Sequence, residues 1–153
     1  MAVDQLAARR SLCGVEAQIG HSSYEPKHCK FQRFHTREEM GRLIRAAEFV
    51  ICHGGAGTLD ECLELGKKLI VVPRLSVHGE APDDHQLQIA THLAAKERVL
   101  LVTNILHLAD QVAAIPHWKP EMTVKHEPSS IVETINAFID GQAAATKDNQ
   151  APR

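Results

Sequence analysis

Short apolar runs alternate with segments of helical periodicity along most of this chain. Runs at residues 49–52, 69–72 and 99–102 are continuous and rich in β-branched residues, which is typical of parallel strands covered on both faces. Residues 15–20 alternate between apolar and polar side chains and end in glycine, so a strand is expected there, and residues 31–34 are expected to form a short second strand. Strands separated by helices predict an α/β, Rossmann-like fold with a mostly parallel sheet and helices on both faces.

The intervening segments carry apolar residues at helical spacing. Thr36 is placed to cap the second helix, Gly66 to end the third, and Ser130 with Glu133 has the spacing of a capping box. Residues 142–153 are polar and alanine-rich, which is typical of a disordered tail, so the folded domain is expected to span residues 1–141. Helices are expected at residues 3–11, from Thr36 to about 47, and at 56–65, 84–96, 106–115 and 130–139.

A glycine-rich turn follows the apolar run at residues 49–52 and precedes a predicted helix. Gly54, Gly55 and Gly57 allow the backbone to approach a ligand, because they place no Cβ in the way. The helix that follows directs its unpaired N–H groups and its positive dipole end at the same space. This combination predicts an anion site, most often for phosphate; a helix C-cap or a tight packing turn is the alternative interpretation.

Polar side chains around this turn suit a nucleotide. His53, when protonated, adds a charge-assisted hydrogen bond to a phosphate, although a helix-capping or core histidine is the alternative. Glu61 lies one helical turn after Thr58, so both can face one ligand, and its carboxylate suits the two hydroxyls of a ribose. The alternative for Glu61 is complementation of the helix dipole, which is also the simplest role for Asp60.

A second polar loop, at residues 74–86, follows the strand expected at 69–72. In open α/β sheets ligands bind beyond the carboxyl ends of the strands, so this loop and the glycine turn are expected at one edge. Asp84, His85 and Gln86 can hydrogen-bond sugar hydroxyls there. Two alternatives stay open: Asp83 and Asp84 cap the helix, or they chelate a divalent metal.

Composition limits the class of protein. The 153 residues fit one domain, and the net charge of −2 gives no sign of nucleic-acid binding. No apolar run approaches the roughly 18 residues of a membrane helix, and the N-terminus has no signal-peptide pattern. The four cysteines form no CxxC pair and are expected to be reduced thiols. Four residues raise a zinc alternative, but their spacing matches no tight ligand pair: His21, His28, Cys29 and His35.

The order of these motifs resembles a known family. The rows HGGAGTLDECLELGKKLIVVPR and DDHQLQIATHL are similar to the donor-binding C-terminal domain of family-28 glycosyltransferases, over roughly residues 3–140. The rows AQIGHSSYEP and EEMGRLIRAAEFVICHGGAGT most resemble the small soluble subunits of two-chain UDP-sugar transferases of the bacterial exopolysaccharide type. The eukaryotic subunit that transfers N-acetylglucosamine in the dolichol pathway is similar as well.

The resemblance implies one half of a GT-B enzyme and an inverting transfer from a UDP-sugar, with no cofactor and no required metal. The glycine turn would hold the diphosphate, His53 would stabilise the leaving group, and Glu61 would bind the ribose. Uracil would lie near residues 34–36, and His85 with Gln86 would contact the sugar. The donor-binding set is then Phe34, His35, Gly54, Gly55, Ala56, Gly57, Thr58, Glu61, Asp84, His85 and Gln86.

The resemblance also implies an assembly. A membrane-anchored partner subunit would supply the general base and the acceptor half, a polyprenyl-linked acceptor would receive the sugar, and the complex would lie at the cytoplasmic face of the membrane. The family domain normally opens with a strand and a V-T-x-G turn, whereas this sequence starts in the helix that would follow, so a gap in the sheet is expected. Two other hypotheses are a non-catalytic nucleotide-sugar-binding or regulatory domain of this fold, and an unrelated Rossmann-like phosphate binder, although no G-x-G-x-x-G follows the first strand.

Overall fold

Five strands, all in parallel pairs, form the framework of residues 1–121, the part of the chain that this computed structural model describes. They lie close to the positions expected from the sequence, although most are shorter. Residues 122–153, with the helix expected at 130–139 and the expected tail, lie outside the described part. The strands are β1 (Glu16–Gln18), β2 (Lys30–Gln32), β3 (Phe49–Cys52), β4 (Lys68–Val71) and β5 (Leu100–Leu101).

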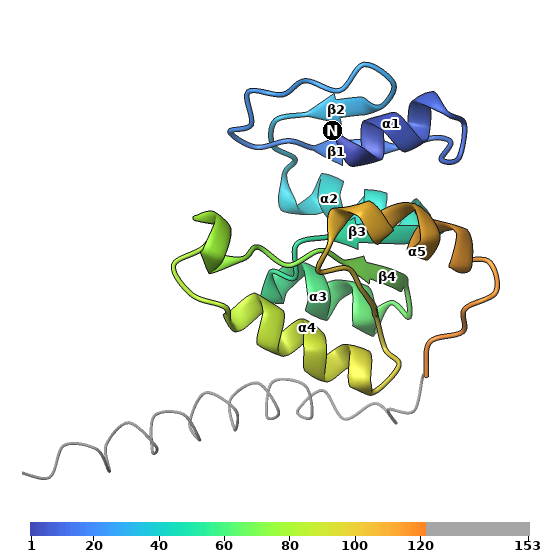
Figure 1. Cartoon of the computed structure of the whole chain (residues 1–153). Helices are drawn as coiled ribbons and strands as arrows, with labels where there is room; N and C mark the ends of the chain where they lie inside the picture. Colours follow the sequence, from blue (N-terminus) through green and yellow to red (C-terminus); the bar gives the residue numbers. More distant parts are fainter. Residues whose placement is uncertain (122–153) are drawn as a thin grey trace, which may run out of the picture. The chain divides into compact units, whose positions relative to one another are not determined.

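A loop joins β1 to β2, and each later connection between strands contains a helix (Figure 1). Two of the helix ends carry the local signals expected from the sequence. Thr36 and Glu39 form a capping box, in which the Thr36 hydroxyl accepts from the Glu39 N–H at 3.2 Å and the Glu39 carboxylate accepts from the Thr36 N–H at 2.8 Å. Gly66 follows the third helix with a φ of 62°. The helices are α1 (Ala2–Ala8), α2 (Arg37–Ala46), α3 (Ala56–Glu64), α4 (His85–Ala95) and α5 (Leu108–Ala114), with 3-10 turns η1 (Ser76–His78) and η2 (Ile105–His107).

The strands belong to two sheets, which bears on the expected gap. β1 pairs with β2, and β3, β4 and β5 form a second sheet in that order. Within residues 1–121 no strand joins β1 to β3, so β3 is an edge strand. Its four apolar residues are all only half-buried, whereas Leu69, Ile70 and Val71 of β4 are fully buried. The expectation of a fully covered strand is therefore wrong for β3 and correct for β4.

Helices cover both faces of the three-stranded sheet, as expected (Figure 1). Side chains of a strand alternate between faces, so Leu69 and Val71 of β4 enter one core cluster and Ile70 enters the other. The first cluster packs α2, α3 and α4 against the sheet: Ile44, Leu59, Cys62, Leu69, Val71, Ala90, Leu93 and Val99. The second packs α1 and α5 on the opposite face: Leu6, Ile70, Val102, Leu108, Val112 and Ile115.

A buried carboxylate anchors α1 to the loop between β1 and β2. Asp4 is only 5% exposed, and it accepts hydrogen bonds from the Tyr24 hydroxyl at 2.6 Å and from the backbone N–H groups of Lys27 at 3.0 Å and His28 at 2.6 Å. The bond from Tyr24 and then those from the backbone lower the pKa of Asp4, and the same bond raises the pKa of Tyr24. The Asp4 side chain of α1 therefore holds this loop in place through hydrogen bonds.

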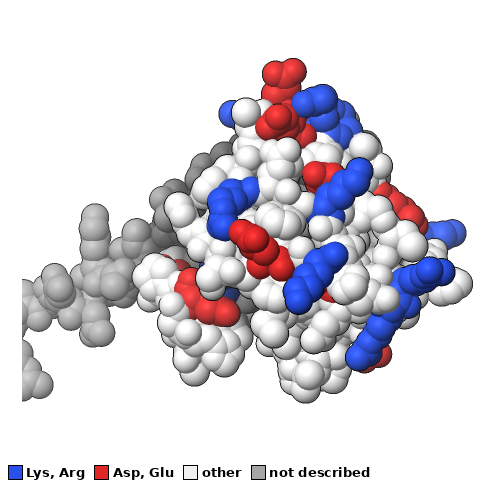
Figure 2. Space-filling view, turned by 90° about the horizontal axis from the view of Figure 1, so that it is seen from above, with Lys and Arg blue, Asp and Glu red and all other residues white. Residues whose placement is uncertain are grey.

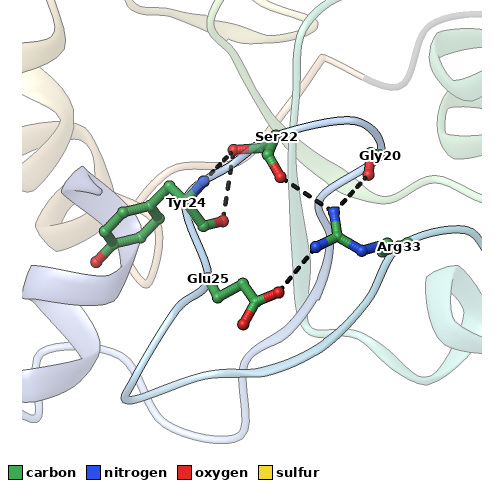
Figure 3. A network of polar contacts seen from close by, with 5 residues as sticks. All are labelled: Gly20, Ser22, Tyr24, Glu25 and Arg33. Atoms are coloured by element: carbon green, nitrogen blue, oxygen red, sulfur yellow. Dashed lines mark hydrogen bonds and ion pairs between the residues drawn. The ribbon is translucent and has the colours of Figure 1, made fainter.

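A guanidinium closes the same loop from its other side (Figure 3). Arg33 donates to the carbonyl oxygens of Gly20 at 3.4 Å and Ser22 at 3.1 Å, and it pairs with Glu25 at 2.8 Å. Gly20 follows β1 and Arg33 follows β2, so these bonds connect the carboxyl ends of both strands. The Arg33–Glu25 ion pair is exposed, and such pairs contribute little stability by themselves.

Replacing Asp4 with asparagine is expected to lower the thermal midpoint at pH 7 by about 5 °C or more, because one amide oxygen cannot replace three charge-assisted bonds. The folded pKa of Asp4 lies below that of an unfolded aspartate. Its stabilisation is therefore present above about pH 4 and is lost as the pH falls toward the folded value. Melting curves from pH 7 to pH 2 should show the wild-type advantage shrinking.

Asp110→Asn is the matched control, since the Asp110 side chain is 78% exposed, and it should change the midpoint little. An Asp4→Asn deficit that stays constant across this pH range would contradict the assigned role of the carboxylate.

Candidate functional site

The glycine turn connects β3 to α3 at the carboxyl edge of the three-stranded sheet. Gly54 has a φ of +87°, and a Cβ at this position would stand 3.1 Å from the Cγ1 atom of Val71. Gly54 therefore satisfies both a left-handed backbone and close packing on β4. Gly57 differs, because a Cβ there would meet nothing within 4 Å. The packing interpretation thus holds for Gly54, and Gly57 faces open space.

Backbone N–H groups at the start of α3 are partly free. The Gly55 carbonyl accepts from the N–H groups of Thr58 at 3.1 Å and Leu59 at 3.0 Å, so the Thr58 amide is already used within the turn. Gly55 is the N-cap and supplies no side-chain cap. The amides of Ala56 and Gly57 have no hydrogen-bond partner among residues 1–121, and both residues are exposed. The Ala56 and Gly57 amides and the positive end of the helix dipole therefore remain available for the expected anion site.

His53 lies over this turn and contacts the second loop. A Cβ on Gly55 would stand 2.7 Å from the Cε1 atom and 3.2 Å from the Nε2 atom of the His53 ring, so a side chain there would displace the imidazole from its present position. The Nδ1 atom of His53 lies 3.3 Å from the Oε1 atom of Gln86. That oxygen also accepts from the Arg74 N–H at 3.2 Å. The structure thus brings together two residues that the sequence placed on separate loops.

The acidic residues of the second loop have structural roles. The Asp84 carboxylate accepts from the Ser76 N–H at 2.9 Å, and this bond lowers the pKa of Asp84. The Asp83 carboxylate accepts from the N–H of His85, the first residue of α4, at 3.1 Å. Capping therefore describes Asp83, whereas Asp84 braces the loop that leads to η1. The helix begins at His85, whose side chain is exposed at the site.

Glu61 belongs to α3, and its side chain lies against α2. Its Oε1 atom stands 2.8 Å from the position of a Cβ on Gly41, a buried residue of α2. The neighbouring residues on α3, Leu59 and Cys62, fill the core, while Glu61 itself is half-buried. Its carboxylate therefore does not point into the apolar core. Sequence reasoning missed Gly41, although a glycine inside a helical pattern is a signal for close packing.

Phe34 and His35 follow β2, and they contact residues of β1 and of the loop that follows β1. The Phe34 ring is 57% exposed and meets the His21 ring edge-on, with 5.0 Å between centroids. The His35 N–H donates to the Gln18 side-chain oxygen at 2.8 Å. The Nε2 atom of His35 is buried and has no hydrogen-bond partner in the described part of the chain. Buried polar atoms are normally paired, so this nitrogen has unused capacity for a ligand or water.

Residues 1–121 were also compared with the features of a metal site, a membrane-spanning helix and a reactive cysteine. No group of three or more histidine, cysteine, aspartate or glutamate side chains there is placed to hold a metal ion, and no helix there is long and apolar enough to cross a membrane. The four cysteines are free, and burial raises the pKa of the Cys62 thiol to about 12, which makes it a poor nucleophile. Figure 2 shows basic and acidic side chains interspersed on the face it displays.

Comparison with known proteins identifies the family of this chain. The sequence profile of the glycosyltransferase family 28 C-terminal domain matches residues 2–140. The chain belongs to this family. This membership sets aside the hypothesis of an unrelated Rossmann-like phosphate binder and confirms the resemblance seen in the sequence.

Two relatives are similar over parts of the chain. One is the UDP-N-acetylglucosamine transferase subunit ALG13 of Candida albicans, 35% identical over 57 residues, which are 37% of this chain and 18% of that protein. Another is the UDP-N-acetylglucosamine–N-acetylmuramyl-(pentapeptide) pyrophosphoryl-undecaprenol N-acetylglucosamine transferase of Prochlorococcus marinus, 30% identical over 88 residues, 55% of this chain and 23% of that protein. The matches thus span about a fifth of each relative.

Proposed function

We infer that this chain is the donor-binding subunit of an inverting UDP-sugar glycosyltransferase. It would work with a membrane-anchored partner on a polyprenyl-linked acceptor, in exopolysaccharide or other cell-surface glycan synthesis at the cytoplasmic face. One observation carries the inference: two unpaired amides at the start of α3 lie beside the His53 imidazole, whose Nδ1 atom contacts Gln86 at the start of α4. Amides, a helix dipole and an imidazole are together a binding site for a diphosphate.

The remaining contacts follow from the site. The carboxylate of Glu61 would accept from the ribose hydroxyls, and uracil would lie near Phe34 and His35. His85 and the free amide group of Gln86 would donate to the hexose.

The proposed reaction is a displacement at the anomeric carbon. An acceptor hydroxyl oxygen forms the new bond on the face opposite the diphosphate, and the bond to the β-phosphate oxygen breaks with its electron pair, which inverts the configuration. The α3 dipole, the Ala56 and Gly57 amides and protonated His53 would stabilise the charge that develops on UDP. The hydroxyl proton would pass to a base on the partner. Because these groups already stabilise the negative charge of the diphosphate, the proposed reaction requires no metal.

The names of the relatives support the choice of ligand. Both are N-acetylglucosamine transferases, one is called a subunit, and the other acts on a pyrophosphoryl-undecaprenol compound. UDP-N-acetylglucosamine is therefore the first donor to test, followed by UDP-glucose and UDP-glucuronate.

The protein is expected to bind UDP at least about tenfold more tightly than UMP, because only UDP places a second phosphate at the amides of Ala56 and Gly57. Titration calorimetry of the full chain, alone and mixed with its partner, measures both affinities. The matched control Gln88→Leu replaces an exposed residue of α4 and should preserve the preference. Equal affinities for UDP and UMP, or no binding of either by the mixture, would overturn the inferred diphosphate site.

A second candidate function is a non-catalytic nucleotide-sugar-binding or regulatory domain. The division into two sheets favours it, because the strand that carries the glycine turn is paired along one side only among residues 1–121. Incubating the chain with its partner, membranes and radiolabelled UDP-sugar separates the candidates. Transfer of label to lipid that depends on this chain supports catalysis; donor binding without transfer supports the second candidate.

A further inference from the structure

We propose that Gln86 is a positioning residue, which fixes the tautomer of His53 and directs the Nε2 atom of its imidazole toward the diphosphate. The diphosphate part of this statement rests on the proposed function, whereas the tautomer part rests on the free protein alone. Gln86 would therefore act through His53, in addition to any contact that its own amide group makes with the sugar.

The first step is the orientation of the Gln86 amide. A backbone N–H can only donate, so the atom that faces the Arg74 N–H at 3.2 Å must be the side-chain oxygen. This contact resolves the usual ambiguity between the oxygen and nitrogen of a glutamine side chain. Gln86 is thus held with its oxygen toward Arg74 and His53.

The contact with Gln86 also determines which ring nitrogen of His53 carries the hydrogen. The same Gln86 oxygen lies 3.3 Å from the Nδ1 atom of His53, and an amide oxygen can only accept. The Nδ1 atom must therefore carry the hydrogen, which leaves the lone pair of neutral His53 on Nε2. Two N–H groups can share one oxygen because a carbonyl oxygen has two lone pairs.

The edge of the His53 ring that does not contact Gln86 faces the glycine turn. Measured from the Cβ position of Gly55, the Cε1 atom of His53 lies at 2.7 Å, Nε2 at 3.2 Å and Nδ1 at 3.6 Å. The ring therefore turns its Cε1–Nε2 edge to the glycine turn, which continues into the unpaired amides of Ala56 and Gly57. A phosphate bound there favours a proton on Nε2, and His53 then donates from both nitrogens.

The amide nitrogen of Gln86 remains available. It makes no hydrogen bond among residues 1–121, so its two donors can still meet a sugar hydroxyl. Loss of Gln86 would then weaken binding of a UDP-sugar by two routes. UDP, which has no hexose, is the probe that isolates the route through His53.

The first experiment measures the tautomer in the free protein, by the imidazole nitrogen resonances of His53 at alkaline pH. Nδ1–H is expected in the wild type and in Gln86→Glu, whose carboxylate still accepts from both N–H groups. Gln86→Leu, which has no acceptor, should lose this preference. An Nε2–H tautomer in the wild type, or an unchanged tautomer in Gln86→Leu, overturns the proposal whatever the ligand is.

The second experiment is a double-mutant cycle on UDP affinity in the full chain with its partner. His53→Ala and Gln86→Leu are each expected to weaken UDP binding about fivefold or more, and the double variant should bind no worse than His53→Ala. Gln88→Leu, on the same helix, should bind as the wild type does. An equal loss from Gln86→Leu in both backgrounds overturns the route through His53. Absence of UDP binding by the wild type overturns the proposed function, and the tautomer measurement still decides the role of Gln86 in the free protein.

Discussion

Replacing Glu61 with alanine is expected to weaken UDP binding by about 10- to 100-fold and to leave the thermal midpoint nearly unchanged. Hydrogen bonds to a charged group are worth about 1.5–3 kcal/mol, and the Glu61 carboxylate is proposed to accept from two ribose hydroxyls. The side chain is half-buried beside Gly41 and fills no core space, so its removal creates no cavity in the apolar core. Calorimetric titration with UDP gives the affinity, and melting curves give the stability.

Glu64→Ala is the matched control, because it removes the same charge from an exposed position one turn later on α3. A nucleotide without the 2′ and 3′ hydroxyls adds a second comparison, since Glu61→Ala should bind it as weakly as it binds UDP, whereas the wild type should distinguish the two. If Glu61→Ala bound UDP as tightly as the wild type does, Glu61 could not be the residue that binds the ribose.

Gly54→Ala is expected to lower the free energy of unfolding by about 2–5 kcal/mol and to abolish measurable UDP binding. A side chain in the left-handed region costs about 1–2 kcal/mol, and overpacking against the buried Val71 side chain adds about 1–3 kcal/mol. The φ of +87° and the contact at 3.1 Å give the physical basis for both contributions. Relief of this strain must move the turn, and the amides that follow it would move with it. Urea unfolding measures the stability, and UDP titration measures the binding.

Gly57→Ala provides the comparison for stability. An added methyl group there meets nothing within 4 Å, and alanine favours a helix over glycine by up to about 1 kcal/mol, so this variant should unfold no more easily than the wild type. If Gly54→Ala and Gly57→Ala were equally stable, the left-handed turn could not be the feature that requires glycine at residue 54.

Local signals predicted the elements of this fold well, and the exceptions are non-local. Thr36 and Gly66 determine helix ends through local geometry, and the structure has both as expected; the bond from the Thr36 N–H to the Glu39 carboxylate completes a capping box that was not predicted. The helix expected at 106–115 is instead η2 followed by α5, because the Asn104 side chain accepts from the Leu106 N–H and stabilises a 3-10 turn. The exposure of β3 depends on which strands flank it, and its own four residues carry no sign of that.

The candidate site shows the same division. Residue types and spacing located His53 and Gln86 on two loops of one edge, since strand ends and glycine turns are local patterns. Their contact could not be read from the sequence, because it depends on how the two loops approach each other in space. The role of the Asp84 carboxylate was missed for a related reason, as its partner is a backbone N–H eight residues earlier in an irregular loop.

Among residues 1–121, β3 is paired along one side only, and it leads directly into the glycine turn. A strand held by one neighbour opens at a lower free energy than a strand held by two, and β3 continues without interruption into His53 and Gly54. The proposed phosphate-binding loop is therefore attached to an edge strand of its sheet rather than to the central strand β4. Amide-hydrogen protection along Phe49–Cys52 and occupancy of the loop are then linked quantities, and a ligand that seats on the loop also contributes to holding that strand closed.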